Sequence, residues 1–289
     1  MRYASYLSAA ATPTWGVEVD GVLYDLGASG KNLAPTLKDA IINGAFGGAA
    51  VDTTDAPATP AADASFLPTI TNPGKILCIG VNYKTHQEET GKAAPAAPTV
   101  FTRFADSQMG HLDAAMRPHT TTQFDYEGEL ALVIGKPAYH VSEDEAWGVI
   151  AGYSPYNDFS VRDWQRAASQ WIPGKNFADT GAFGPYLVPV ADIPDIEALT
   201  LETRVNGEVR QSASLADLVF TIPQIIAYVT GFTALSPGDV IVTGTPGGVG
   251  LFMDPQGLLS HGDIVEVDIS GLGVLRNTVV QAEAPRSVS

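Results

Sequence analysis

The stretch Phe124-Asp-Tyr-Glu-Gly-Glu-Leu-Ala-Leu-Val-Ile-Gly135 combines three acidic residues with an apolar run. Side chains alternate across a β-strand, so Asp125, Glu127 and Glu129 are expected on one face. The uniformly apolar Leu-Ala-Leu-Val-Ile that follows predicts a strand that becomes buried. Carboxylates buried side by side repel one another, and a divalent cation such as Mg²⁺, Mn²⁺ or Ca²⁺ would remove that cost. A solvated strand face is the alternative interpretation.

The sequence on either side of this stretch is typical of a chain built mainly from short strands. Residues 75–81 (KILCIGV), 146–158 (AWGVIAGYSPYND) and 239–242 (DVIV) are short apolar runs. Helices are expected at 160–171, with Ser160 as N-cap, and at 221–231, where Thr221 and Gln224 match a capping box. The pattern predicts a β-dominated α+β fold.

Residues 1–73 are predicted to form a small N-terminal domain and a linker. Two strand-like runs, 15–19 and 22–26, flank Asp20-Gly21, which favours a two-residue hairpin turn of type I′. Residues 35–44 predict a helix that ends at Gly44. Residues 51–74 are rich in Ala, Pro, Thr and Asp without periodicity and are interpreted as the linker. The second domain is then expected over 74–289.

Composition excludes several classes of protein. Of the 289 residues, 45% are hydrophobic and 17% charged, as in globular proteins rather than disordered ones. The net charge of −16 would repel nucleic acid and anionic membranes. The single cysteine, Cys78, excludes an internal disulfide and a cysteine-based zinc site. With no membrane-length apolar run and no signal-peptide pattern, we expect a soluble cytoplasmic protein.

Residues 82–89 (NYKTHQEE) predict a short helix with catalytic potential. Thr85 and Glu88 are spaced as a capping box, and Gly91 can end the helix. His86 and Glu89 then share one face. A histidine held by a carboxylate is suited to act as a general base. A surface helix with incidental charges is equally compatible with the pattern.

Other polar groups occur where strands end or turns begin. Asp158 ends an apolar strand, although a plain turn residue fits the same position. Arg162 and Gln165 share a helix face and could donate hydrogen bonds to a ligand carboxylate. Lys175 stands in a Gly/Pro turn. The turn 243–250 (TGTPGGVG) lacks a phosphate-loop ending, yet its N–H groups could hold an oxyanion or a carboxylate.

Six segments between Lys75 and Asn277, taken in order, resemble the fumarylacetoacetate hydrolase family, in particular its bacterial acylpyruvate hydrolases and 2-hydroxyhepta-2,4-diene-1,7-dioate isomerases. They are KILCIGVNYKTHQEE, FDYEGELALVIGK, GYSPYNDFSVRDWQ, PGKNFADTGAFGP, LETRVNGEVRQ and DVIVTGTPGGVG. The resemblance implies a mixed β-roll or sandwich domain, a homodimer, and one Mg²⁺ or Mn²⁺ per site. It also implies a role in the catabolism of aromatic compounds.

The resemblance assigns roles residue by residue. Glu127, Glu129 and Asp158 would be metal ligands, and His86 with Glu89 would activate water in a segment that orders over the substrate in relatives. Three further residues complete the implied site: Lys175 as oxyanion stabiliser, and Thr245 and Arg103 as substrate contacts. Many relatives have lysine where Arg103 stands, which leaves its role open.

The expected reaction is hydrolysis of a C–C bond in a small anionic 2,4-dioxo acid of the acylpyruvate or fumarylpyruvate type. Water deprotonated by His86 would attack the distal carbonyl, and the metal would stabilise the departing carbanion as an enolate. Decarboxylation or isomerisation of oxaloacetate-like or unsaturated oxo-diacids at the same site is the alternative. A non-catalytic domain that binds metal or a small molecule is a remote third.

Overall fold

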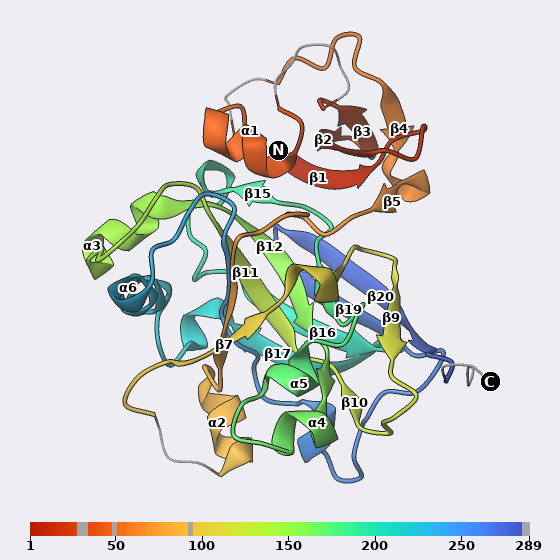
Figure 1. Cartoon of the computed structure of the whole chain (residues 1–289), viewed down its shortest axis with the longest axis vertical. Coiled ribbons are helices and arrows are strands. Elements are labelled where there is room, and N and C mark those ends of the chain that lie inside the picture. Colours follow the sequence, from red (N-terminus) through yellow and green to blue (C-terminus); the bar gives the residue numbers. More distant parts are fainter. Residues whose placement is uncertain (28–33, 48–50, 92–94, 285–289) are drawn as a thin grey trace, which may run out of the picture.

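The computed structural model describes residues 1–27, 34–47, 51–91 and 95–284. Strands dominate this part of the chain, and they form curled sheets with short helices around them (Figure 1), which confirms the predicted α+β class. The helices are α1 (Leu37–Asn43), α2 (Lys84–Thr90), α3 (Glu143–Ala146), α4 (Arg162–Arg166), α5 (Ile172–Lys175) and α6 (Ile222–Phe232). No helix among the described residues is long and apolar enough to cross a membrane.

The N-terminal residues form a sheet of their own, with α1 against it, at the top of Figure 1. Asp20 and Gly21 have φ of 50° and 81°, as the predicted type I′ turn requires, and Gly44 ends α1 in the left-handed region. Residues 51–74 are not the unstructured linker predicted, because two of their strands pair with the sheet edges. The strand order is β4 (Ala58–Pro60), β3 (Val22–Asp25), β2 (Pro13–Val19), β1 (Arg2–Leu7) and β5 (Ser65–Phe66).

Two larger sheets make up the rest of the fold. The first has the order β7 (Thr99–Arg103), β6 (Ile76–Gly80), β18 (Val240–Val242), β11 (Gly128–Ile134), β12 (Ile150–Asp158), β14 (Gly181–Phe183) and β8 (Gln108–Met109), with β15 (Val188–Pro189) beside β12. The second has the order β17 (Glu208–Ser214), β16 (Thr200–Val205), β19 (Ile264–Ile269), β20 (Gly273–Gln281) and β9 (Ala114–Arg117). A short pair, β10 (Phe124–Asp125) with β13 (Ser160–Val161), lies at one end.

Strand β11 is apolar along its whole length because both of its faces are covered. Leu130 and Leu132 belong to the core that the first sheet shares with residues of β16, β19 and β20. Ala131 and Val133 belong to a second core, which includes Trp15 and residues of α1. A strand buried on two sides reads as a continuous hydrophobic run rather than an alternating one. The N-terminal sheet and α1 therefore cover one face of the first of the two larger sheets.

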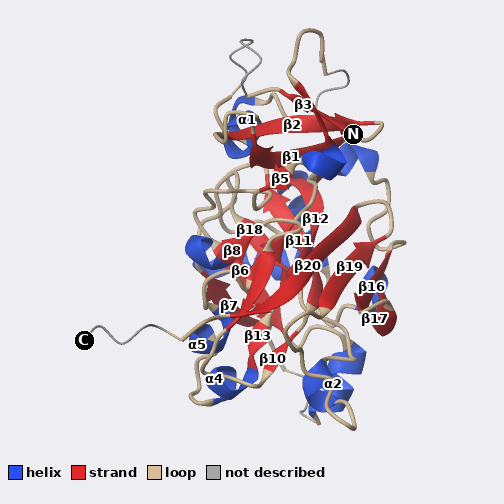
Figure 2. Ribbon diagram, turned by 90° about the vertical axis from the view of Figure 1, so that its right-hand side faces the viewer, coloured by secondary structure: helices blue, strands red, loops and turns tan. Residues whose placement is uncertain are grey.

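The segments that carry the predicted site lie at the end of the molecule remote from the N-terminal sheet. Both views place α2, α4, α5 and the β10–β13 pair there (Figures 1 and 2). Helix α6 begins with the predicted capping box, although it ends at Phe232 instead of Gly231. The long helix expected at 160–171 is wrong: Ser160 belongs to β13, and α4 has five residues.

Candidate active site

Three carboxylates converge where β11 begins and β12 ends. Glu127 immediately precedes β11, Glu129 is its second residue, and Asp158 is the last residue of β12. The two strands are antiparallel with Gly128 opposite Asn157, so the acids become neighbours. One oxygen of each lies within 4.8 Å of the others, and none of the three residues is more than 5% exposed. The site residues that the sequence separates by thirty positions are therefore brought together.

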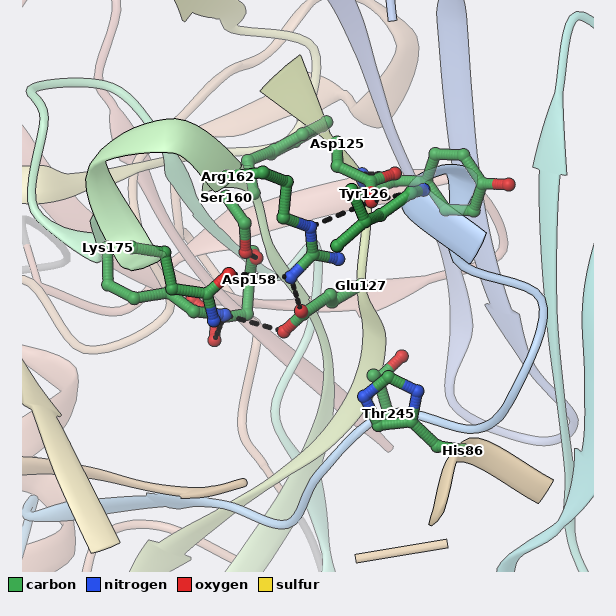
Figure 3. A network of polar contacts seen from close by, with 12 residues as sticks. His86, Asp125, Tyr126, Glu127, Asp158, Ser160, Arg162, Lys175 and Thr245 are labelled. Atoms are coloured by element: carbon green, nitrogen blue, oxygen red, sulfur yellow. Dashed lines mark hydrogen bonds and ion pairs between the residues drawn. The ribbon is translucent and has the colours of Figure 1, made fainter. Parts of the chain in front are cut away.

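Basic side chains partly neutralise this cluster (Figure 3). Lys175 Nζ donates to Glu127 Oε2 and to Asp158 Oδ2, each at 2.6 Å, and Arg162 Nη1 donates to Glu127 Oε1. Burial alone would raise the pKa of Glu127, but the charges of Lys175 and Arg162 outweigh it and hold that pKa at about 2. Burial, with the charges of Asp158 and Glu127, raises the pKa of Glu129 well above its ordinary value.

The donor set fits a divalent cation. Three buried carboxylates within reach of one another supply the hard oxygen ligands that Mg²⁺ and Mn²⁺ prefer. Glu127 and Asp158 each form ion pairs with basic side chains, whereas Glu129 forms none with a described residue, in line with its raised pKa. A cation bound by Glu127, Glu129 and Asp158 would supply the missing positive charge.

Asp125 belongs to a different arrangement from the one its spacing suggested. The chain leaves strand geometry between β10 and β11, so Asp125 does not share the face of Glu127 and Glu129. Its carboxylate accepts hydrogen bonds from the backbone N–H groups of Gly250 and Leu251, both at 2.9 Å, and from Arg162 Nε at 2.8 Å. Asp125 therefore positions Arg162 and the 250–251 backbone.

The predicted pair on α2 forms. His86 Nδ1 lies 2.7 Å from Glu89 Oε1, and the histidine is only 6% exposed. The other ring nitrogen, Nε2, makes no hydrogen bond within the described residues, and the ring lines the cavity described below. The capping box expected for this helix is wrong, because α2 has Tyr83 as N-cap and no side-chain cap. The Thr85 hydroxyl instead accepts from Gly247 N–H at 3.0 Å.

A cavity of about 100 Å³ separates this pair from the carboxylates. Its lining combines apolar side chains, among them Phe101, Trp171, Leu251 and Phe252, with the charged groups of the site. The two kinds lie next to each other, since Lys175 Nζ lies 5.1 Å from the centroid of the Phe101 ring. No described residue before Ile79 lines it, so the N-terminal sheet contributes no side chain. Of the predicted site residues, the following line the cavity: His86, Glu127, Glu129, Arg162, Gln165, Lys175 and Thr245.

Arg103 lies behind the carboxylates rather than in the cavity. Its guanidinium is buried, binds Asp158, and donates to the Thr180 hydroxyl at 2.7 Å. Among the described residues it does not belong to the cavity lining. The predicted contact with substrate therefore becomes, in this geometry, a contact with a candidate metal ligand.

The glycine-rich turn after β18 (Val240–Val242) binds carboxylates, but they are the protein's own. Gly244 N–H donates to Glu129 Oε2 at 2.6 Å, and Gly248 N–H donates to Glu89 Oε2 at 2.9 Å. Gly248 has a φ of 100°, which favours glycine. The turn thus connects a candidate metal ligand with the residue that orients His86.

Sequence reasoning missed several residues of the cavity. Trp171 packs so closely on β6 that a Cβ at Gly80 would lie 2.2 Å from Trp171 Cζ3. Phe252 places its ring centroid 6.1 Å from that of His86. Arg166 lies at the same cavity, next to the predicted Gln165. Neither aromatic residue stands in a motif, whereas Arg166 could have been found from its place on α4.

Comparisons with known proteins identify the family of this chain. Residues 75–280 match the model of the fumarylacetoacetate (FAA) hydrolase C-terminal domain. The mitochondrial oxaloacetate tautomerase FAHD2A of Homo sapiens is 41% identical over 226 residues, which cover 78% of this chain and 72% of that protein.

Solved structures match over nearly the whole chain. A fumarylacetoacetate hydrolase from Exiguobacterium antarcticum superposes with a TM-score of 0.86 at 33% identity, covering 98% of this chain and 100% of that one. A 5-carboxymethyl-2-hydroxymuconate delta-isomerase from Mycobacterium smegmatis has a TM-score of 0.79 at 30% identity, with the same coverage. The chain belongs to the fumarylacetoacetate hydrolase family.

Proposed function

We propose that the protein is a divalent-metal-dependent enzyme that moves a proton on a small 2-oxo acid, with keto–enol tautomerisation of oxaloacetate-type acids as its reaction. The observation that carries the proposal is that His86, held by Glu89, lines the same small cavity as Glu127 and Glu129, two of the three clustered carboxylates. A volume of about 100 Å³ is small beside the roughly 300–1,000 Å³ of pockets for drug-sized ligands. The similarity to an oxaloacetate tautomerase supports the same substrate class.

Glu127, Glu129 and Asp158 would hold the cation, which when bound supplies Lewis-acid polarisation of the 2-oxo group and a charge for the adjacent carboxylate. Arg162 helps to bind the acid, because its Nη2 is buried without a hydrogen-bond partner among the described residues. Gln165 accepts from Arg162 Nη1 through its side-chain oxygen at 2.9 Å, which leaves its amide N–H groups for a ligand. These donors orient the acid toward His86.

His86 transfers the proton. Its Nδ1 is held by Glu89, so Nε2 is the atom that faces the reacting carbon. In the keto-to-enol direction, Nε2 takes a proton from C3 of the acid, the C2–C3 double bond forms, and a proton is returned to the 2-oxo oxygen. Glu89 stabilises the imidazolium that exists between the two transfers. The reverse sequence converts enol to keto acid, so atoms and charge balance in both directions.

Hydrolysis of a 2,4-dioxo acid is the second candidate, and the same pair favours it. His86 could take a proton from a water whose oxygen attacks the C4 carbonyl; the C3–C4 bond then breaks, and a proton is delivered to C3. Lys175 was predicted to stabilise the oxyanion of this reaction. Because Nζ is bound to two carboxylates at 2.6 Å, that role requires it to serve substrate and carboxylates together. The role of Lys175 as oxyanion stabiliser stays a prediction, and so does the homodimer.

Metal-stripped and Mg²⁺-loaded protein should be tested with oxaloacetate, following the enol absorbance, and with 2,4-dioxopentanoate, following pyruvate and acetate. The rate with free Mg²⁺ alone is subtracted, since the ion promotes enolisation by itself. We expect metal-dependent tautomerisation that His86→Ala slows by about 10²–10⁴-fold. His119→Ala, which changes an exposed histidine outside the cavity, should leave the rate unchanged. Hydrolysis without tautomerisation would favour the second candidate, and activity on neither acid would contradict the proposal.

A further inference from the structure

One basic side chain of the cavity differs from the others in forming no ion pair with a described residue. Arg162, Lys175 and Arg166 all line it. Arg162 and Lys175 each form ion pairs with two carboxylates of the site. Arg166, in contrast, forms no ion pair with any described residue. Its positive charge is available to a ligand.

Arg166 is held at the mouth of the cavity rather than inside it. It lies one helical turn after Arg162 on α4 and is exposed, whereas Arg162 is 3% exposed. Its Nε donates to the Arg162 carbonyl at 3.2 Å and its Nη2 to Gln123 Oε1 at 2.8 Å. Both partners are uncharged oxygens, so they fix the guanidinium without cancelling its charge, and they leave Nη1 free to donate.

The carboxylates of the protein around the site are bound by groups other than Arg166. The buried groups, counted as ionised, carry a net charge of −1, and a divalent cation changes it to +1, which one carboxylate of a bound acid neutralises. The groups counted are Asp125, Glu127, Glu129 and Asp158 against Arg103, Arg162 and Lys175. The partly exposed Glu89 carboxylate contacts His86 and Gly248 N–H, so it does not pair with Arg166.

We propose that Arg166 is the specificity-determining residue that binds the distal carboxylate of an oxo-diacid whose 2-oxo-acid end is held at the carboxylate cluster. The inference rests on the proposed function, whose oxaloacetate-type acid carries a second carboxylate, and it assigns the residue that binds that group. A planar guanidinium with a free edge binds a carboxylate through charge-assisted hydrogen bonds. Phe101, Trp171 and Phe252 also line the cavity, so the carbon chain of the acid can contact apolar side chains there.

The test compares two stable acids that differ only at the far end: 2-oxoglutarate, with a terminal carboxylate, and 2-oxopentanoate, with a methyl group in its place. Dissociation constants are measured by calorimetry on Mg²⁺-loaded protein. We expect wild type to prefer 2-oxoglutarate and Arg166→Gln to weaken its binding about 10- to 100-fold, the usual effect of losing a hydrogen bond to a charged group. Binding of 2-oxopentanoate should change less than about twofold.

Two further variants serve as controls. Arg166→Lys keeps the charge and should restore part of the preference. Arg276→Gln removes a half-exposed arginine on β20, outside the cavity, and should change neither constant. Equal weakening of both acids by Arg166→Gln, no weakening of either, or no binding of either acid by wild type would each overturn the inference. If Arg166→Gln loses the preference for 2-oxoglutarate while the wild type is inactive on both oxaloacetate and 2,4-dioxopentanoate, the proposed reaction is contradicted and the inference about Arg166 is not.

Discussion

Glu129→Gln should make the metal-free protein more stable while it weakens metal binding. The Glu129 carboxylate accepts a hydrogen bond from Gly244 N–H at 2.6 Å, and a glutamine oxygen can keep that bond. The glutamine cannot ionise, so the repulsion with Asp158 and Glu127 that raises the pKa of Glu129 disappears. The substitution is nearly equal in volume and leaves the core unchanged.

The size of the stability gain depends on pH. A group whose pKa is raised by folding stabilises the protein below its unfolded pKa, and this contribution is lost as the pH rises through the folded pKa. The wild type should therefore lose stability with rising pH relative to Glu129→Gln. Removing an uncompensated buried group contributes about 1–3 kcal/mol, and roughly 2–4 °C in Tm accompanies each kcal/mol in a large domain.

The metal affinity of the wild type should change with pH in the opposite direction to its stability. Binding must displace the proton of Glu129, so wild-type affinity for Mn²⁺ should rise about tenfold per pH unit wherever Glu129 is protonated in the metal-free protein. In Glu129→Gln one anionic ligand is gone, and affinity should fall by more than the ~10–100-fold caused by losing a residue that only hydrogen-bonds a ligand. Its remaining affinity should depend little on pH.

The assays are calorimetric titration with Mn²⁺ and chemical unfolding of metal-stripped protein at several pH values. Asp125→Asn is the matched control, since Asp125 is equally buried but is bound by Arg162 and two backbone N–H groups. Asp125→Asn should lower the stability of the metal-free protein, whereas Glu129→Gln should raise it. Unchanged Mn²⁺ affinity in Glu129→Gln, or a loss of stability as large as in Asp125→Asn, would refute the reasoning.

Three further results are expected. His86→Ala should lower the rate of proton transfer by the ~10²–10⁴-fold typical of losing a general base, while the affinity for Mn²⁺ persists. Glu89→Gln should lower the rate less, and a wild-type rate in His86→Ala would show that α2 is only a surface helix. Lys175→Met removes the ammonium group that pairs with two buried carboxylates, so it should lower the free energy of unfolding in EDTA by about 3–5 kcal/mol. Added Mg²⁺ should restore part of that loss, and a thermal unfolding temperature that does not rise with Mg²⁺ would contradict this. Burial and, to a lesser degree, the charge of Arg276 lower the pKa of His111 to about 4. Neutral His111 therefore contributes fully to stability above about pH 6.5, and this contribution is lost as the pH falls toward 4. In denaturant titrations His111→Gln should make stability depend less on pH over this range, and an unaltered profile would argue against the prediction.

Local sequence was sufficient wherever neighbouring residues decide the geometry. The Asp20-Gly21 turn, the Gly44 end of α1 and the capping box of α6 follow from backbone sterics within a few residues. The contact between His86 and Glu89 follows from the spacing of one helical turn. The ordered motifs also identified the family, which the match over residues 75–280 confirms.

Predictions failed where a competing partner lies far away in the chain. Thr85 has the spacing of a helix cap, yet its hydroxyl binds Gly247, 162 residues later. Asp125 shares the strand alternation of the metal-site acids, yet Arg162 and the 250–251 backbone draw it into another arrangement. A helix cap contributes about 1 kcal/mol to stability, and a buried hydrogen bond to a distant part of the chain can contribute more.

By itself the sequence determined the short strands, the acids at their ends and the His86–Glu89 pair, because these depend on local geometry and residue chemistry. Only the tertiary structure decided that Arg103 supports Asp158 from behind, that the glycine turn binds the protein's own carboxylates, and that Arg166 is left unpaired at the mouth of the cavity. The physical reason is that the charge state of a buried group depends on every neighbour around it. Those neighbours come from segments that the sequence order does not place together.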